Sequence, residues 1–279
     1  MAATLKYTKK AFASSILLWM RDGVPRQQSM DRWKGPHSKI ITASPGQDEY
    51  RQLHLLEDSP GIWPATPGVE TAIPESRRVD GVAEVTFTSV LGPLGGRKQT
   101  ALAYQDEIHN FRRTLLYAGL PYSTRWYDVD APGDHAGARL YLLLRRRDDI
   151  STRVFRRYLY DEFVPQVATG AKLTELRTQV FMPWNQRLWN TPNVAHDNPV
   201  DQRFHASVIL GFADRAALHD FLDGFVPQSL GERLARNASA VHAYEMTAYR
   251  YKRDGVLMPR IEESGGSVGI VTSTECRHR

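Results

Sequence analysis

Two histidines near the start of the chain are the side chains best suited to move a proton. His37 follows Trp33 by one helical turn in the segment DRWKGPH at residues 31–37, so a helix would place both rings on one face. Pro36 removes a backbone donor and crowds the preceding turn, and we expect the resulting bend to tilt His37 toward a cavity between helix and sheet. A neutral imidazole serves as a general base or acid. His37 is therefore the predicted base.

Two further side chains could take part in the same chemistry. His54 shares one face of a predicted strand with Tyr50 and Gln52, a polar set that could line a cavity or face solvent. Glu84 lies on the next predicted strand, where it could orient a histidine, carry a second proton or simply face solvent. We therefore predict His54 and Glu84 as catalytic partners of His37, and Tyr50 as a substrate contact.

Aromatic side chains are predicted to form the walls of the site. Trp63 and Trp189 stand in long loops that contain Pro and Thr, where a tryptophan could act as a lid over a pocket or as a plug that seals the core. Tyr127 could supply a phenolic donor or a stacking surface, although aromatics at such spacing more often belong to the core. Together with Trp33, these are the predicted substrate-binding aromatics.

The chain repeats itself with a shift of 126 residues, which places Leu17 on Leu143 and Trp63 on Trp189. The predicted elements also follow the same order in both halves. In the first half, strand, helix, strand, strand, helix and strand are predicted at residues 12–20, 25–44, 50–56, 82–90, 100–118 and 125–129. In the second half they are predicted at residues 139–146, 151–169, 176–182, 204–212, 216–238 with a break near Pro227, and 241–251, with Ser151 as a helix N-cap.

The order βαββαβ is the ferredoxin-like plan. Each half would form an antiparallel sheet with helices on one face, and its opposite apolar face must be covered. Two halves can cover each other sheet to sheet. We therefore predict an α+β fold of two fused ferredoxin-like repeats that form an intramolecular dimeric α+β barrel. The repeats are expected at residues 1–133 and 134–254, followed by a partly flexible tail at 255–279.

The pair of Trp33 and His37 on the first helix, next to Gly and Pro, resembles the signature of the EthD family of the dimeric α+β barrel superfamily. The resemblance in plan covers most of both halves. In the second half, Leu159 and Phe163 fall on Trp33 and His37, so the imidazole is missing there. If His37 is catalytic, the protein has one active half and one structural half.

Composition limits the classes of protein to consider. The net charge is +5, but the arginines are scattered and no nucleic-acid motif occurs, so no nucleic-acid partner is expected. No apolar run approaches the ~20 residues that a membrane span needs. The single cysteine, Cys276, excludes an intrachain disulfide and a cysteine-based metal site, and it fits a cytoplasmic protein. The histidines lack metal-ligand spacing, so no metal is expected.

The resemblance implies a small-molecule enzyme that works without metal or organic cofactor on an aromatic or polyketide-like substrate. We expect proton-transfer chemistry of the lyase or cyclase type, such as dehydration, decarboxylation or cyclisation. One alternative is a cofactor-independent monooxygenase, and another is a non-catalytic ligand-binding or accessory protein of an oxidative pathway. Haem is the alternative to a cofactor-free site, because related barrels are haem proteins. The fused pair could associate further into a homodimer.

Overall fold

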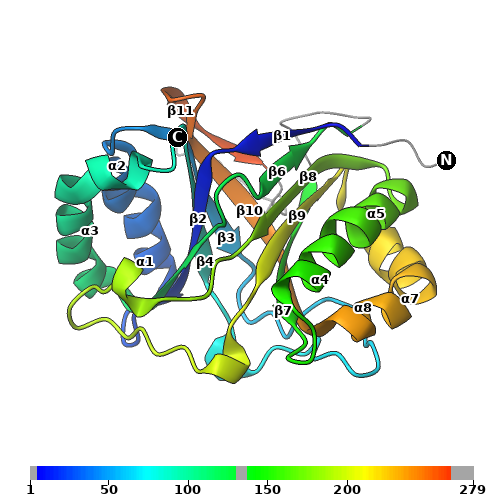
Figure 1. The fold of residues 1–279 in the computed structure, drawn as a ribbon. Coiled ribbons are helices and arrows are strands. Elements are labelled where there is room, and N and C mark those ends of the chain that lie inside the picture. Colours follow the sequence, from blue (N-terminus) through cyan, green and yellow to red (C-terminus); the bar gives the residue numbers. More distant parts are fainter. Residues whose placement is uncertain (1–4, 130–136, 265–279) are drawn as a thin grey trace, which may run out of the picture.

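The computed structural model describes residues 5–129 and 137–264, which form a mixed α+β fold (Figure 1). Strands lie at the centre, and helices cover them on two opposite sides. The strands form one continuous sheet in the order β1-β6-β8-β9-β7-β10-β3-β4-β2-β5, with β11 paired to β10. The α+β class predicted from the sequence is confirmed. None of the helices in the described ranges is long and apolar enough to cross a membrane.

The first half of the chain supplies strands β1 to β6 and the helices on one side. Their bounds are β1 (Tyr7–Lys10), β2 (Phe12–Met20), α1 (Arg26–Arg32), α2 (Ser38–Thr42), β3 (Gln47–Leu55), β4 (Gly81–Phe87), α3 (Arg97–Asn110), β5 (Phe111–Ala118) and β6 (Thr124–Tyr127). A π-helical turn over Trp33–His37, with Pro36 inside it, joins α1 to α2. The bend expected at Pro36 therefore takes the form of a widened helical turn.

The second half supplies the remaining strands and the helices on the other side. Their bounds are β7 (Ala138–Arg146), α4 (Thr152–Arg157), α5 (Val164–Gly170), β8 (Leu173–Val180), β9 (Ala206–Phe212), α6 (Arg215–Asp220), α7 (Val226–Ser229), α8 (Gly231–Asn237), β10 (Ala238–Arg253) and β11 (Val256–Ser264). A π-helical turn over Tyr158–Phe163 joins α4 to α5, at the place that corresponds to Trp33–His37. Ser151 accepts a hydrogen bond from the backbone of Val154, which confirms it as an N-cap.

Strand β10 connects the two halves of the sheet. Its first part pairs with β7 and its second part pairs with β3, both antiparallel. At the opposite side, two backbone hydrogen bonds link the end of β5 to the end of β8, from Leu120 N to Val180 O at 2.9 Å and from Met182 N to Ala118 O at 2.8 Å. The sheet therefore curves back toward itself, which is the arrangement of a barrel.

Three apolar clusters fill the layers of the molecule. One lies between the helices and strands of the first half, and it includes Trp33 and Phe111. Another lies between the helices and strands of the second half, and it includes Phe163. The third joins side chains from strands of both halves, among them Leu53 and Leu143. The faces of the two half-sheets that carry no helices therefore cover each other.

A network of buried charges crosses the space between the two half-sheets. Arg51, which is 1% exposed, donates to Glu84 in its own half at 2.8 Å and to Glu175 in the other half at 2.8 Å. Arg139 also reaches Glu175 at 2.6 Å. Burial raises the pKa of Glu175, but its arginine neighbours outweigh this effect and hold the pKa well below its usual value. The carboxylate is therefore charged and tied to both halves.

The second helix predicted for the first half is wrong over its C-terminal part. The helix expected over residues 100–118 ends at Asn110, and Phe111–Ala118 forms strand β5 beside β2. Phe111 and Leu115 are four residues apart, which fits a helix, but β2 needs a partner on this side and tertiary pairing decides the conformation. The segment predicted as the fourth strand, residues 125–129, corresponds to the shorter strand β6, which pairs with β1 and β8.

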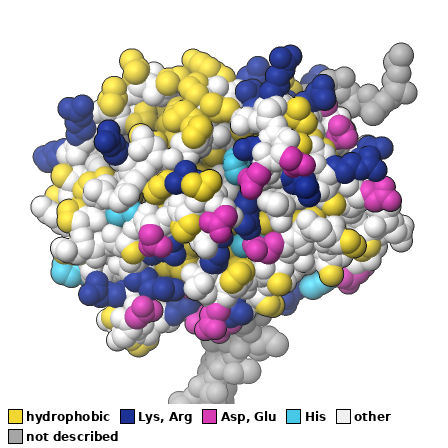
Figure 2. All heavy atoms as spheres, turned by 60° about the horizontal axis from the view of Figure 1, so that its bottom comes forward, with side chains coloured by type: hydrophobic (Ala, Val, Ile, Leu, Met, Phe, Trp, Pro, Cys, Tyr) yellow, Lys and Arg dark blue, Asp and Glu magenta, His cyan; other side chains and the backbone are white. Residues whose placement is uncertain are grey.

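The segment after residue 255, predicted as a partly flexible tail, forms β11 over Val256–Ser264, and residues 265–279 lie outside the described part. The predicted boundary near residue 133 also lies outside it. On the face shown in Figure 2, basic side chains are interspersed with acidic ones over most of the surface, and hydrophobic side chains gather near its upper edge.

We expect Arg51→Met to destabilise the protein by about 3–5 kcal/mol, because it removes the buried cation that binds Glu84 and Glu175 most directly and leaves these carboxylates to Arg177 and Arg139. Arg236→Met is the matched control, since its ion pair with Glu232 is exposed and such pairs contribute about 0–1 kcal/mol. The free energy of unfolding in urea measures both changes. Equal stability of the two variants would contradict a structural role for this network.

Candidate functional site

His37 is buried on the π-helical turn and is held by a carboxylate of α3. Its Nδ1 lies 3.0 Å from Oδ2 of Asp106, and Arg32 donates to the other oxygen of that carboxylate. Burial raises the pKa of Asp106, but hydrogen bonds from His37 and Arg32 outweigh it, so the pKa lies below its ordinary value. A charged Asp106 makes Nδ1 the donor, which leaves Nε2 as the ring nitrogen that can accept a hydrogen bond.

The next residue of α3, Glu107, places a second buried carboxyl group in this region. Its carboxylate is 1% exposed, and it accepts hydrogen bonds from Nε1 of Trp189 at 3.2 Å and from the hydroxyl of Thr191. Burial raises the pKa of Glu107. Two neighbouring carboxyl groups therefore have pKa values displaced in opposite directions, and this is how acid and base roles are separated in enzyme sites.

An apolar cavity of about 530 Å³ lies between α2, α3 and the strands β2, β4 and β5. Its apolar lining includes Phe12, Ile16, Ile41, Val85, Phe87 and Leu116. Tyr104 of α3 and Trp189 from the second half close one end, with ring centroids 5.1 Å apart and in an edge-to-face arrangement. The volume and the mostly apolar lining are typical of a site for a small organic molecule.

The cavity ends one helical turn away from His37 and Glu107. Ile41 follows His37 by one turn, and Tyr104 precedes Glu107 by one turn, so these two lining residues separate the cavity from His37 and Glu107. Trp189 bridges this wall, because its ring lines the cavity while its Nε1 bonds to Glu107. The predicted tilt of His37 into a cavity is therefore not seen, because His37 is absent from the lining of this cavity and lies behind the wall.

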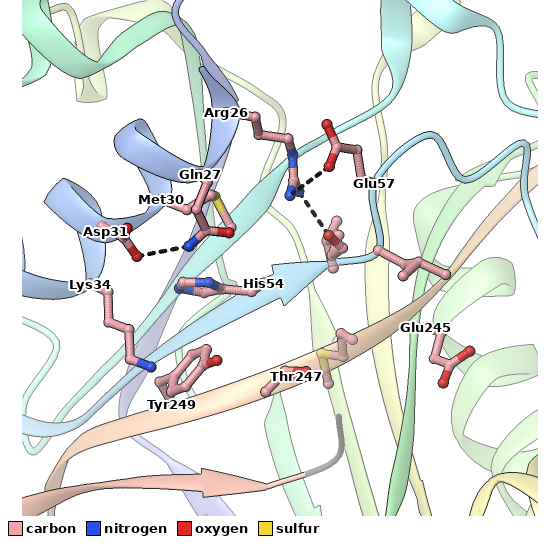
Figure 3. A pocket seen from close by; sticks show the side chains of 13 residues that line it. Arg26, Gln27, Met30, Asp31, Lys34, His54, Glu57, Glu245, Thr247 and Tyr249 are labelled. Carbon is pink, nitrogen blue, oxygen red and sulfur yellow. Dashed lines mark hydrogen bonds and ion pairs between the residues drawn. The ribbon is translucent and has the colours of Figure 1, made fainter. Parts of the chain in front are cut away.

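His54 lies in a separate, polar groove of about 290 Å³ at the other end of the same helix–sheet interface. Figure 3 shows its ring between Met30 of α1 and Tyr249 of β10. It stacks on Trp33 with centroids 4.6 Å apart, and its Nε2 lies 3.1 Å from Oε1 of Gln52. Burial, together with the nearby cations Lys34 and Arg26, lowers the pKa of His54 to about 3, so at neutral pH it is an uncharged hydrogen-bonding group.

Tyr50 is buried below this groove. The amide of Gln52 donates to the Tyr50 hydroxyl at 2.9 Å and to the Trp33 carbonyl at 2.8 Å. Burial raises the pKa of Tyr50 above its ordinary value. Tyr50 and Trp33 are fully buried, so they support His54 from behind, and their predicted contact with substrate stays a prediction.

Three predicted site residues lie away from His37. Glu84 faces the interior between the half-sheets, where it binds Arg51. Trp63 packs in the core of the second half against Phe163, with centroids 6.5 Å apart, which agrees with the interpretation of Trp63 as a plug. Tyr127 of β6 lines a third cavity between the half-sheets. The structure thus groups Trp33, His37, Tyr50 and His54 on the helix side of the first half, and it adds Trp189 from the second half.

The sequence alone does not single out Asp106, Glu107 or Tyr104 as members of the site. All three lie on α3, and the acidic pair resembles the solvated face of any amphipathic helix, so no local signal separates it from exposed carboxylates. Trp189 was predicted as a substrate contact, but the approach of its loop to the first half depends on tertiary structure.

Within the described residues, no group of three His, Cys, Asp or Glu side chains is arranged to hold a metal ion. The apolar cavity has no His or Cys in its lining, so its residues do not fit a haem with such an axial ligand.

Comparison with known proteins supports the fold class. No family model matches the sequence, and no curated protein sequence matches it. An anthrone oxidase-like protein of known structure aligns with a TM-score of 0.54 and 8% identity, over 94% of this chain and 98% of that one. A putative monooxygenase from Lactobacillus acidophilus NCFM aligns with a TM-score of 0.50 and 7% identity, over 90% of this chain and 100% of that one. At these identities the similarity shows the fold alone, a dimeric α+β barrel, and it does not show the EthD family.

We expect His54 to make the protein less stable as the pH falls. The unfolded imidazole takes up a proton near pH 6.5, whereas folded His54 resists protonation until about pH 3, so stability is complete above about pH 6.5 and is lost toward pH 3. His54→Gln removes this titration. The free energy of unfolding of this variant should therefore fall less than that of the wild type between about pH 7 and about pH 4.5. Urea unfolding at both pH values measures the difference, with the exposed His219→Gln as control. An unchanged pH dependence in His54→Gln would contradict the buried neutral imidazole.

Proposed function

We propose that the chain is a cofactor-free small-molecule enzyme that binds an aromatic or polyketide-like substrate in the apolar cavity and moves a proton with His37. The observation that carries this proposal is the position of two oppositely displaced carboxyl groups. Asp106 is charged and orients His37, while the pKa of Glu107 is raised by burial and its carboxyl group is bonded to a cavity-lining tryptophan. This combination supports acid–base chemistry more strongly than simple ligand storage.

In this proposal Nε2 of His37 removes a proton from a substrate carbon, and that C–H electron pair forms a C=C bond. The neighbouring C–O bond breaks as Glu107 protonates the departing hydroxyl, which leaves as water. The proton on His37 then passes to Glu107 through solvent, which restores both groups. The Tyr104 hydroxyl accepts a hydrogen bond from Asn190 N at 3.2 Å, which leaves its own proton for an enolate or phenolate oxygen. Burial raises the pKa of Tyr104, so the hydroxyl keeps that proton. Reaction requires the wall at Ile41 and Tyr104 to move aside, as substrate binding often induces.

The alternative function is a cofactor-independent monooxygenase, in which His37 forms the substrate anion and molecular oxygen supplies the oxidant. Its support is the two structures of similar fold, an anthrone oxidase-like protein and a putative monooxygenase. A second alternative is a non-catalytic ligand-binding or accessory protein. Oxygen uptake with substrate separates the first alternative from a lyase, and loss of turnover in a His37 variant separates both enzymes from a binder.

We also propose that the chain consists of two fused ferredoxin-like repeats. Each half has the strand order 4-1-3-2 of a ferredoxin-like unit, and both carry a π-helical turn in the first helical region, which supports two fused repeats. Trp33 and His37 support the EthD resemblance. We propose a homodimer as the state of association, to be checked by sedimentation.

We expect His37→Gln to slow proton transfer at carbon by about 100-fold or more, the usual contribution of a positioned base. Anthrone serves as a probe, because its methylene protons exchange with deuterated water and the exchange is followed by NMR without knowledge of the natural substrate. The exposed His219→Gln is the matched control. Exchange in His37→Gln at the wild-type rate, with anthrone bound, would overturn the role of His37.

We expect Leu116→Trp to abolish binding of the same probe, because Leu116 lines the apolar cavity and the larger ring would fill it. Quenching of tryptophan fluorescence measures binding, and Val200→Trp, at an exposed position outside the cavity lining, controls for the added tryptophan. Undiminished affinity in Leu116→Trp would place the ligand elsewhere.

A further inference from the structure

The charged side chains that line the apolar cavity are all basic. It contains Arg97, at the start of α3, and Arg187, from the second half, but no Asp or Glu. Neither arginine side chain forms a hydrogen bond or an ion pair within the described residues, although many other arginines of this protein are paired. Arg97 and Arg187 are therefore two exposed cations in the lining of an apolar cavity, and no carboxylate of the described residues pairs with them.

The backbone adds to this positive potential. Helix α3 begins at Arg97, runs for 14 residues and has no acidic residue in its first turn. Its N-cap is Gly96, which gives no side-chain cap, and both Gly96 and Thr100 line the cavity. The positive end of the helix macrodipole therefore lies at the same opening, and such an end favours an anion.

Inside the cavity lies a polar group without a partner. Gln47 is 4% exposed and lines the cavity, and its Oε1 has no hydrogen-bond partner among the described residues. A buried acceptor left without a donor is costly, and most such groups in folded proteins are satisfied. A ligand hydroxyl in the cavity would supply the missing donor.

We infer that the cavity selects a hydroxylated apolar carboxylic acid. The carboxylate lies at the opening between Arg97, Arg187 and the start of α3, the apolar body fills the cavity, and a hydroxyl donates to Gln47. This inference rests on the proposed function, because it names the class of substrate for the same site. It gives Arg97, Arg187 and Gln47 the role of setting specificity.

The test compares three small probes by calorimetry on the full chain. These are 6-hydroxy-2-naphthoate, its neutral amide 6-hydroxy-2-naphthamide, and 2-naphthoate, which lacks the hydroxyl. We expect the hydroxylated acid to bind about tenfold more tightly than the amide, the scale expected of a few exposed charge contacts and a helix terminus. The advantage should shrink as salt is added.

Substitutions assign this preference to residues. Arg97→Gln combined with Arg187→Gln should lower the affinity for the acid to that for the amide and leave the amide unchanged. Arg236→Gln, on an exposed helix of the other half, is the matched control and should keep the preference. Gln47→Leu should remove the advantage of the hydroxylated acid over 2-naphthoate, while both still bind.

The outcomes separate this inference from the proposed function. If the acid and the amide bind the wild type equally and Leu116→Trp abolishes both, the cavity is the binding site but the anion preference is wrong. If the acid binds equally well to Leu116→Trp and to the double arginine variant, it occupies another site, and both proposals fall. Loss of the acid preference in the double variant alone confirms the inference.

Discussion

Strand β10 belongs to both halves of the protein, and the arrangement of everything else depends on this shared strand. It pairs with β7 along its first part and with β3 along its second, so the backbone hydrogen bonds of the two half-sheets are continuous. The faces without helices must then meet each other, and Arg51 and Glu175 meet between them. Charges in such a place are tolerated because they are paired and hydrogen-bonded across the interface.

The helices are consequently left on the outer faces, and the two helix–sheet layers differ in chemistry. In the first half the π-helical turn carries His37, which faces Asp106. In the second half the corresponding turn carries Phe163, which packs against Trp63. Each loop tryptophan crosses to the opposite half, so Trp63 seals an apolar layer while Trp189 bonds to Glu107 beside the polar one. The helix–sheet layer of the second half is therefore an apolar core, whereas that of the first half combines titratable groups with a cavity.

Much of the framework could be predicted from the sequence, because apolar runs and turn residues act locally. The strand at residues 12–20 has the predicted bounds, and Ser151 caps its helix as its side chain requires. The helix that contains Trp33 and His37 was also predicted, although its π-helical turn was expected only as a bend. That Tyr50 and His54 lie on the same face of β3 follows from strand geometry alone, because successive side chains alternate between the two faces.

The errors arise where partners distant in sequence decide the outcome. Phe111 and Leu115 fit a helix as well as a strand, and only the pairing of β5 with β2 settles the choice. The burial of Asp106 and Glu107 depends on His37 and on a loop from the other half, so their pKa displacements have no signature along α3. Glu84 was placed on the correct strand, but which face of β4 meets the second half is a property of the assembled sheet.

The most direct test of the account is a crystal structure of the protein grown with 6-hydroxy-2-naphthoate. The account predicts density for the naphthalene ring between α2, α3 and the sheet of the first half, in contact with Tyr104 and Trp189. Density only in the polar groove beside His54, or only between the half-sheets beside Arg177, would contradict it.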